Sequence, residues 1–384
     1  MKVFIIAGEP SGDRLGGALM AGLRALVPEV QFNGVGGEAM AAEGLTPRFP
    51  MSDLSVMGLL EVLPRLSLLR QRIHETSKAI LATGPDVVIT IDSPDFCLRV
   101  LRRARAARPA LPTVHYVAPS VWAMRPKRAA RMAPLVDHVL ALLPFEPPYM
   151  QAAGMSCDFV GHPVVAEPPA CAEAVAALRA AHQGPVMLVL PGSRRGEILR
   201  LAPRFGAALG KALPEGMRVL VPSVAAQADL MREEVARWPV PAEILAEPRA
   251  KRAAFEIADL ALAASGTVSL ELAASATPMV IAYDMNPLTR WLAARLLQID
   301  TVTLVNLVSE TRAVPECLGK NCTPARIADA LRTLMQHEAA QRAQRDAMRV
   351  TLQRLGQGQE APGLRAARSV LGFLDRRKGH KAGQ

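Results

Sequence analysis

Directly after a short apolar run, residues 265–271 bring together the hydroxyls of Ser265 and Thr267, a glycine and a carboxylate. The run is short enough for a buried strand, and the residues that follow the glycine have helical spacing. Unpaired backbone N–H groups at a helix start attract a phosphate, Gly266 lets the backbone approach it, and Ser265 or Thr267 can donate a hydroxyl. Glu271 lies one turn beyond Thr267, where its carboxylate can accept both hydroxyls of a ribose. The segment indicates a nucleotide site; the alternative is a capped helix whose Glu271 faces solvent.

Two carboxylates follow apolar runs nearer the start of the chain. Asp92 comes after a run ending at residue 91, and Glu9 opens the loop after residues 2–7. A carboxylate at a strand end can act as a general base, or it can be a structural hydrogen-bond acceptor, and both readings of Asp92 stay open. Ser11 and Asp13 lie in the Glu9 loop and are candidates by position; the alternative is that they cap the helix that follows.

A third loop, residues 191–197, combines small and basic residues after another apolar run. Ser193 allows close backbone approach, and the Arg194 guanidinium can bind a phosphate through two N–H groups.

The elements that must position these residues alternate between strands and helices along the chain. The apolar runs predict strands at 2–7, 31–35, 86–91, 113–117 and 136–143, and then at 186–190, 218–221, 242–245, 258–264 and 279–283. Such alternation is typical of parallel, doubly wound α/β sheets, whose functional loops lie at the carboxyl ends of the strands. We therefore predict two Rossmann-like domains, residues 1–166 and 167–350, divided at a proline-rich stretch. Residues 351–384 are expected to form a helical segment and a basic, disordered tail.

Composition restricts the partners. The 384 residues carry a formal charge of +10, which favours an anionic partner: nucleic acid, an anionic lipid surface or a phosphorylated substrate. Nucleic-acid binding by stacking is disfavoured because aromatics make up only 4% and the basic residues are dispersed. The five cysteines show no Cys-x-x-Cys spacing, so neither a metal site nor a disulfide framework is predicted, and a reducing cytoplasm is expected. No window offers the ~20 uninterrupted apolar residues of a transmembrane helix.

Residues 56–69 are rich in leucine and include Arg65, and Arg70 and Arg72 follow the segment directly. A helix with an apolar side and an arginine rim can lie on an anionic membrane surface. The alternative is an apolar stripe that packs on the sheet.

The loop sequences together resemble the lipid-A-disaccharide synthase family, which has the glycosyltransferase-B architecture of two Rossmann-like domains facing across a cleft. The resemblance covers about the first 310 residues and rests on seven motifs in one order: Gly8-Glu9-Pro10-Ser11-Gly12-Asp13, Asp92-Ser93-Pro94-Asp95-Phe96, His115-Tyr116-Val117-Ala118-Pro119-Ser120-Val121-Trp122, Leu143-Pro144-Phe145-Glu146, Phe159-Val160-Gly161-His162, Leu190-Pro191-Gly192-Ser193-Arg194 and Ala264-Ser265-Gly266-Thr267.

The resemblance implies an inverting hexosyltransferase that joins UDP-2,3-diacylglucosamine to 2,3-diacylglucosamine 1-phosphate, forming a β-1,6-linked disaccharide 1-phosphate and releasing UDP. It implies that Asp92 or Glu9 is the catalytic base and that no cofactor or metal is needed. The residues that it assigns to the UDP of the donor are Ser193, Arg194, Ser265, Gly266, Thr267, Glu271 and Asn306. Because both sugars carry acyl chains, it also implies a cytoplasmic protein that is peripheral on the inner membrane through residues 56–69.

Several positions depart from the family's pattern, among them Cys97 and Met124. Cys97 stands where an asparagine is usual, and Met124 stands where a second tryptophan is usual. Neither change removes a charged group. The competing hypotheses are another UDP-sugar enzyme of the same architecture, either a glucosaminyltransferase or an epimerase, and a basic nucleic-acid-binding protein.

Overall fold

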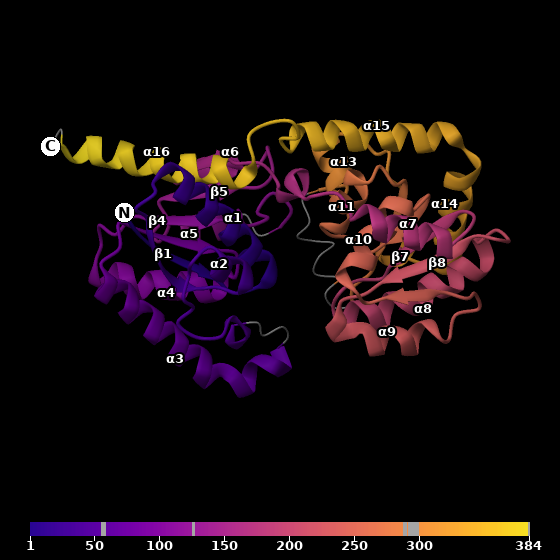
Figure 1. Cartoon of the computed structure of the whole chain (residues 1–384), viewed down its shortest axis with the longest axis horizontal. Helices are drawn as coiled ribbons and strands as arrows, with labels where there is room; N and C mark the ends of the chain where they lie inside the picture. Colours follow the sequence, from indigo (N-terminus) through magenta and orange to yellow (C-terminus); the bar gives the residue numbers. More distant parts are fainter. Residues whose placement is uncertain (55–58, 125–126, 287–289, 291–298, 383–384) are drawn as a thin grey trace. The chain divides into compact units, whose positions relative to one another are not determined.

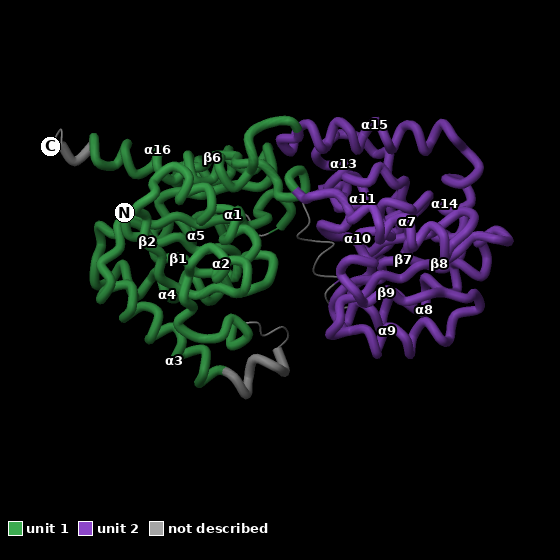
Figure 2. The backbone as a smooth tube through the Cα atoms, in the orientation of Figure 1, with its two compact units in different colours: residues 1–166, 358–384 green, residues 167–357 purple. Residues whose placement is uncertain are grey.

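The chain forms two compact units in the computed structural model, which describes residues 1–54, 59–124, 127–286, 290 and 299–382, without the side chains of 59–65 and 380–382. The first unit contains residues 1–166 and 358–384, and the second contains residues 167–357 (Figure 2). The last helix thus belongs with the beginning of the chain, while residues 351–357 end the second unit.

The first unit is built on a six-stranded parallel sheet in the order β2-β1-β3-β4-β5-β6. Its strands are β1 Lys2–Ala7, β2 Gln31–Val35, β3 Val87–Ile91, β4 Thr113–Tyr116, β5 His138–Ala141 and β6 Ser156–Phe159. Strands of a parallel sheet are buried on both faces, which explains why their sequences are nearly continuous apolar runs.

Helices cover both faces of this sheet (Figure 1). They are α1 Pro10–Leu26, α2 Glu38–Ala42, α3 Leu59–Thr83, α4 Pro94–Ala107, α5 Lys127–Met132, α6 Pro147–Ala152 and α16 Pro362–Ala382, with the short 3-10 turns Met51–Asp53 and Pro163–Ala166. Side chains alternate along β1: Ile5 packs with α1, α2 and α16, and Phe4 and Ile6 pack with α3 and α4.

The second unit repeats the architecture with the strand order β12-β11-β10-β7-β8-β9. Its strands are β7 Val186–Leu190, β8 Arg218–Pro222, β9 Glu243–Leu245, β10 Leu260–Ala263, β11 Met279–Tyr283 and β12 Glu316–Leu318. Its described helices are α7 Ala172–Ala181, α8 Arg195–Ala212, α9 Ala228–Val235, α10 Pro248–Ile257, α11 Val268–Ala274, α13 Leu304–Ser309, α14 Pro324–Gln336 and α15 Glu338–Arg354, with the 3-10 turns Ala225–Gln227 and Gly319–Asn321.

Each sheet has a point at which the direction of winding reverses. In the first unit β1 lies between β2 and β3, so the chain passes over β1 to start the other half of the sheet. In the second unit the reversal falls between β7 and β10. Ligands of open α/β sheets bind outside the carboxyl ends of the strands at such switch points. The loops that follow β1, β3, β7 and β10 carry the predicted site residues, except for Glu271 in α11 and Asn306 in α13.

The prediction of two doubly wound parallel sheets is confirmed, and the differences lie in the details. The apolar pattern does not predict the edge strands β6 and β12, because strands of four and three residues leave little pattern. The expectation of a disordered basic tail is wrong, since α16 continues to Ala382. Arg377 explains part of this order: its guanidinium lies 3.1 Å from the Asp137 carboxylate and donates to the Ala110 carbonyl at 3.0 Å.

Candidate active site

The carboxyl ends of β1 and β3 bring Glu9 and Asp92 to one edge of the first sheet. The last residues of the two strands pair in parallel register, so their loops leave the sheet side by side. The loops also touch, since a Cβ atom on Gly8 would lie only 2.6 Å from the Ser93 hydroxyl oxygen. Both predicted acidic residues therefore lie at the switch point of the first unit.

Asp92 occupies a tight turn. Its φ is 49° and that of Ser93 is 42°, so two successive non-glycine residues adopt the left-handed conformation. The Asp92 carboxylate is half-buried, and the described part of the chain gives it no hydrogen bond or ion pair. Cys97 packs nearby with no exposed surface, and burial, followed by the negative charge of Asp92, raises the pKa of its thiol. The thiol therefore stays protonated and packs as an apolar group.

The other polar residues of the first loop have different environments. Glu9 is half-buried at the position before α1, and Ser11 is exposed within the first turn. Asp13 is a structural residue: its carboxylate accepts three backbone N–H groups at the start of α2, from Gly37 at 2.7 Å, Ala39 at 2.9 Å and Met40 at 3.1 Å. It caps the neighbouring helix α2, not the helix that contains it.

A third carboxyl group at this edge was not identified as a candidate from the sequence. Glu146 follows β5 and is 4% exposed; its carboxylate accepts from the Leu142 and Leu143 N–H groups at 3.1 and 3.0 Å and from the Trp122 indole N–H at 3.2 Å. Burial raises its pKa to about 7, against the opposing effect of these donors. The Trp122 ring also meets Phe145 edge-on, with 5.1 Å between ring centroids. Glu146 thus anchors a tryptophan on the loop that follows β4.

In the second unit, a pocket of about 490 Å³ opens at the switch point between β7 and β10. The residues that line it include six of the seven predicted nucleotide-binding residues: Ser193, Arg194, Ser265, Gly266, Thr267 and Glu271. Gly192, also in the lining, has a φ of 117°, a conformation that favours glycine. The two loops, more than seventy residues apart in the chain, form one site because their strands are neighbours in the sheet.

Charged side chains in the pocket form two ion pairs, each between a basic and an acidic residue. Arg194, 64% exposed, lies 3.6 Å from the Glu197 carboxylate, which also accepts a hydrogen bond from the Tyr283 hydroxyl at 3.4 Å. Lys251 on α10 lies 3.2 Å from the Glu271 carboxylate. Glu197 and Lys251 were not proposed as site residues from the sequence. The spacing of Glu197 after the Arg194 loop could have suggested it, whereas Lys251 is twenty residues from Glu271 and carries no local signal.

Asn306 is the exception among the predicted nucleotide-binding residues. It does not line the pocket, and it is 1% exposed. Its carboxamide donates to the Val314 carbonyl at 2.9 Å and to the Thr301 hydroxyl at 3.2 Å, and it accepts from the Val314 N–H at 3.0 Å. In the structure Asn306 therefore braces its own loop, and the contact with the nucleotide that the resemblance implies stays a prediction.

The leucine-rich segment 56–69 lies mostly outside the described residues, since positions 55–58 and the side chains of 59–65 are not described. Of its end, Leu66, Leu68 and Leu69 are half-buried. Arg72, expected on the basic rim, instead lies 2.7 Å from the Asp53 carboxylate and over the Phe49 ring, 4.5 Å from its centroid. No described helix is both long enough and apolar enough to span a bilayer.

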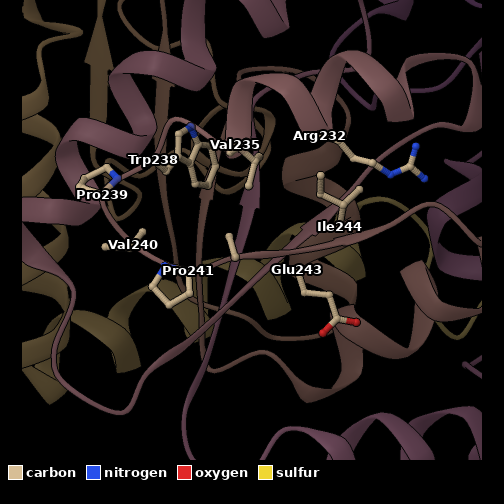
Figure 3. Close-up of a pocket in the computed structure, with 10 residues that line it drawn as sticks. Arg232, Val235, Trp238, Pro239, Val240, Pro241, Glu243 and Ile244 are labelled. Carbon is tan, nitrogen blue, oxygen red and sulfur yellow. The ribbon is translucent and has the colours of Figure 1, made fainter.

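A second pocket, of about 720 Å³, is lined by residues between α9 and β9 (Figure 3). It lies at the amino end of an edge strand and contains none of the predicted site residues. The Trp238 indole nitrogen has no hydrogen-bond partner among the described residues; it faces α8, where a Cβ on Gly206 would be 2.7 Å from it. The position and lining of this pocket do not match a nucleotide site. In the described part of the chain, no three His, Cys, Asp or Glu side chains are placed to hold a metal ion.

Solved structures share this fold. A UDP-GlcNAc 2-epimerase from Neisseria meningitidis, bound to UDP-GlcNAc, matches with a TM-score of 0.62 at 11% identity, covering 98% of this chain and 100% of the epimerase chain. MurG of Acinetobacter baumannii matches with a TM-score of 0.53 at 14% identity, covering 98% and 99% of the two chains. The fold therefore defines the class as the glycosyltransferase-B architecture, which includes glycosyltransferases and sugar epimerases. A family model described as lipid-A-disaccharide synthetase matches residues 3–368, and the chain belongs to that family of glycosyltransferases.

Relatives with the same family name match this chain over nearly its whole length. A lipid-A-disaccharide synthase of Ruegeria pomeroyi is 63% identical over 388 residues, covering 97% of this chain and 96% of the relative. Another, of Rhodospirillum centenum, is 48% identical over 385 residues, covering 98% and 96%.

Proposed function

We propose that this chain transfers the diacylglucosamine unit of UDP-2,3-diacylglucosamine to the 6-hydroxyl of 2,3-diacylglucosamine 1-phosphate. The bond from the anomeric carbon to the diphosphate oxygen breaks while the bond to the acceptor oxygen forms. The hydroxyl proton passes to a carboxylate, and the bonding electron pair leaves with UDP. A single displacement inverts the anomeric centre, so no covalent intermediate is required.

The observation that carries the proposal is the pocket between the Arg194 loop and the 265–267 turn in a chain of this family. Arg194 and the backbone around Ser193 and Gly266 would hold the diphosphate and stabilise its growing negative charge. Glu271 would accept the ribose hydroxyls.

Asp92 is our choice for the base, with Glu9 as the alternative. Its carboxylate has no partner in the described residues and sits on a tight turn at the switch point of the first unit. A base needs a free acceptor oxygen within reach of the hydroxyl proton.

The proposed substrates carry acyl chains, so the enzyme must meet them at the surface of a bilayer. We propose that the protein is peripheral on the cytoplasmic face of the inner membrane and that residues 56–69 contact lipid. The leucine spacing and the positive net charge of +10 support this location.

Incubation of the purified chain with both acylated substrates tests the reaction. We expect equimolar release of UDP and of a disaccharide monophosphate, measured by a coupled UDP assay and by mass spectrometry. UDP-GlcNAc with and without an unacylated acceptor is the control. Turnover of UDP-GlcNAc alone, with none of the acylated pair, would instead favour an epimerase or another transferase.

A further inference from the structure

Lys251 and Glu271 form an ion pair at the wall of the donor pocket. Lys251 lies in the first half of α10, Glu271 lies in α11, and both line the pocket with Ser265, Gly266 and Thr267. The ammonium nitrogen and a carboxylate oxygen are 3.2 Å apart. The two side chains are 36% and 34% exposed, so each keeps surface open to a ligand.

The lysine is itself held in place. Its ammonium lies 5.6 Å from the centroid of the Phe255 ring, one turn further along α10, and Phe255 is 6% exposed. A cation near the face of a fixed aromatic ring loses part of its rotational freedom before any ligand binds. Lys251 therefore presents an oriented charge to Glu271.

An unanchored glutamate at this exposure would sample several rotamers, and only some of them point into the pocket. A carboxylate that must accept two hydroxyl groups at once needs both oxygens in one orientation. One oxygen of Glu271 is in contact with Lys251, and a carboxylate oxygen has a second lone pair free for a hydroxyl.

We propose that Lys251 is a positioning residue that holds the Glu271 carboxylate toward the two ribose hydroxyls of the donor nucleotide. The inference rests on the proposed function, because it assumes that the pocket binds UDP. Lys251 acts through Glu271 and sets the preference of the site for a ribonucleotide over a deoxyribonucleotide.

Calorimetric titration of the full chain with UDP and with 2′-deoxy-UDP tests the role. We expect Lys251→Met to weaken UDP binding about threefold to fivefold, the upper part of the range for a partly exposed ion pair, and to weaken 2′-deoxy-UDP less, because that nucleotide offers Glu271 only its 3′-hydroxyl. The ratio of the two affinities therefore falls. Lys251→Arg keeps the charge and should restore most of the ratio. Lys211→Met removes an exposed lysine of the same unit outside the pocket and should match the wild type.

A second experiment distinguishes positioning of Glu271 from a general effect of removing the lysine charge. In a Glu271→Gln background, Lys251→Met should cause no further change in the ratio, because the carboxylate that it positions is gone. An unchanged ratio in Lys251→Met, including an equal loss for both nucleotides, overturns the inference but leaves the proposed function standing. Absence of UDP binding by the wild-type chain overturns the proposed function instead. Matching circular dichroism spectra and melting curves verify that each variant is folded.

Discussion

Asp92 shows how one residue can be placed by the backbone alone. It follows a buried strand, and its positive φ turns the carboxylate away from the extended direction of that strand. Such a conformation costs on the order of 1 kcal/mol or more for a non-glycine residue, and it persists where the surrounding structure enforces it. Asparagine tolerates the same conformation well, so the charge can be removed with little change in the backbone.

We expect Asp92→Asn to lower kcat by roughly 10²- to 10⁴-fold, the usual contribution of a general base, while the affinity for UDP stays within about twofold. Steady-state kinetics and calorimetry measure the two quantities. Glu9→Gln is the matched comparison. If Asp92→Asn retains most of its activity and Glu9→Gln does not, the base is Glu9.

The Glu146 carboxyl gives a prediction about pH. Burial raises its pKa to about 7 from an ordinary value of 4.5, so the folded chain favours the protonated form. Its contribution to stability is full below pH 4.5 and is lost as the pH rises through about 7. The stability of the wild type relative to a Glu146→Gln variant should therefore fall between pH 5 and pH 8. Urea unfolding curves at pH 5, 6, 7 and 8 measure the difference; a pH-independent difference would contradict it.

At the scale of elements, the terminal helix α16 is attached to the first unit by a buried histidine. The ring nitrogens of His138 on β5 lie 2.8 Å from the hydroxyls of Ser156 and Ser369, and the ring stacks on Phe373 with 5.1 Å between centroids. Ser369 also donates to the Asp158 carboxylate at 2.6 Å. Burial lowers the pKa of His138 to about 4, although the negative charge of Asp158 opposes the shift.

Because the pKa of His138 is lowered in the folded chain, neutral His138 contributes to the stability of the fold above about pH 6.5. That contribution is lost as the pH falls toward 4. We therefore expect amide hydrogen exchange in residues 362–377 to increase between pH 7 and pH 5, after correction for intrinsic rates. Helix α15 of the second unit is the internal control. Equal protection of α16 at both pH values would rule out this attachment as a pH-sensitive contact.

The loop after β7 depends on a glycine. At Gly192 the φ of 117° strains any other residue, and an added Cβ would lie 2.6 Å from a Glu197 carboxylate oxygen. We expect Gly192→Ala to weaken UDP binding about tenfold, because the change displaces the Arg194 loop by strain and by steric clash. Gly196→Ala is the control, since a Cβ there meets no atom within 4 Å. Equal affinities for both variants would show that the loop tolerates a side chain.

At the scale of the whole molecule, the proposed contact with anionic lipid draws on two features of the sequence, the charge of +10 and the leucine-rich segment. Basic surfaces attract anionic lipid over about a Debye length, and apolar side chains then add binding energy. Attachment of the proposed kind, through one amphipathic segment and surface charge, would be interfacial and reversible.

Replacement of Leu60, Leu63 and Leu66 with serine should shift the chain from anionic vesicles to the supernatant in a sedimentation assay. Each buried leucine contributes about 1.5–3 kcal/mol on transfer from water, so the loss should exceed tenfold in partition coefficient. Leu81→Ser, on the same helix with Leu81 41% exposed, is the control. Unchanged partitioning of the triple variant would indicate that these leucines pack within the protein.

The sequence by itself determined the alternation of strands and helices and the loops that carry chemistry. Both are local: a parallel strand must be apolar throughout, and its carboxyl-end loop begins where the apolar run stops. That is why the order of residue types is enough to select Asp92, Arg194 and the 265–267 turn. Edge strands as short as β6 and β12 are not predicted in this way, because three or four residues are too few to show a hydrophobic pattern.

Only the tertiary structure decided which polar side chains face a pocket and which form hydrogen bonds or ion pairs within the protein. Asn306 braces a loop, Arg72 pairs with Asp53, and Lys251 meets Glu271 from a separate helix. The physical reason is that a hydrogen bond or an ion pair depends on distances of about 3 Å between segments remote in the chain. Those distances arise from how helices pack on a sheet, and no spacing along the sequence records them.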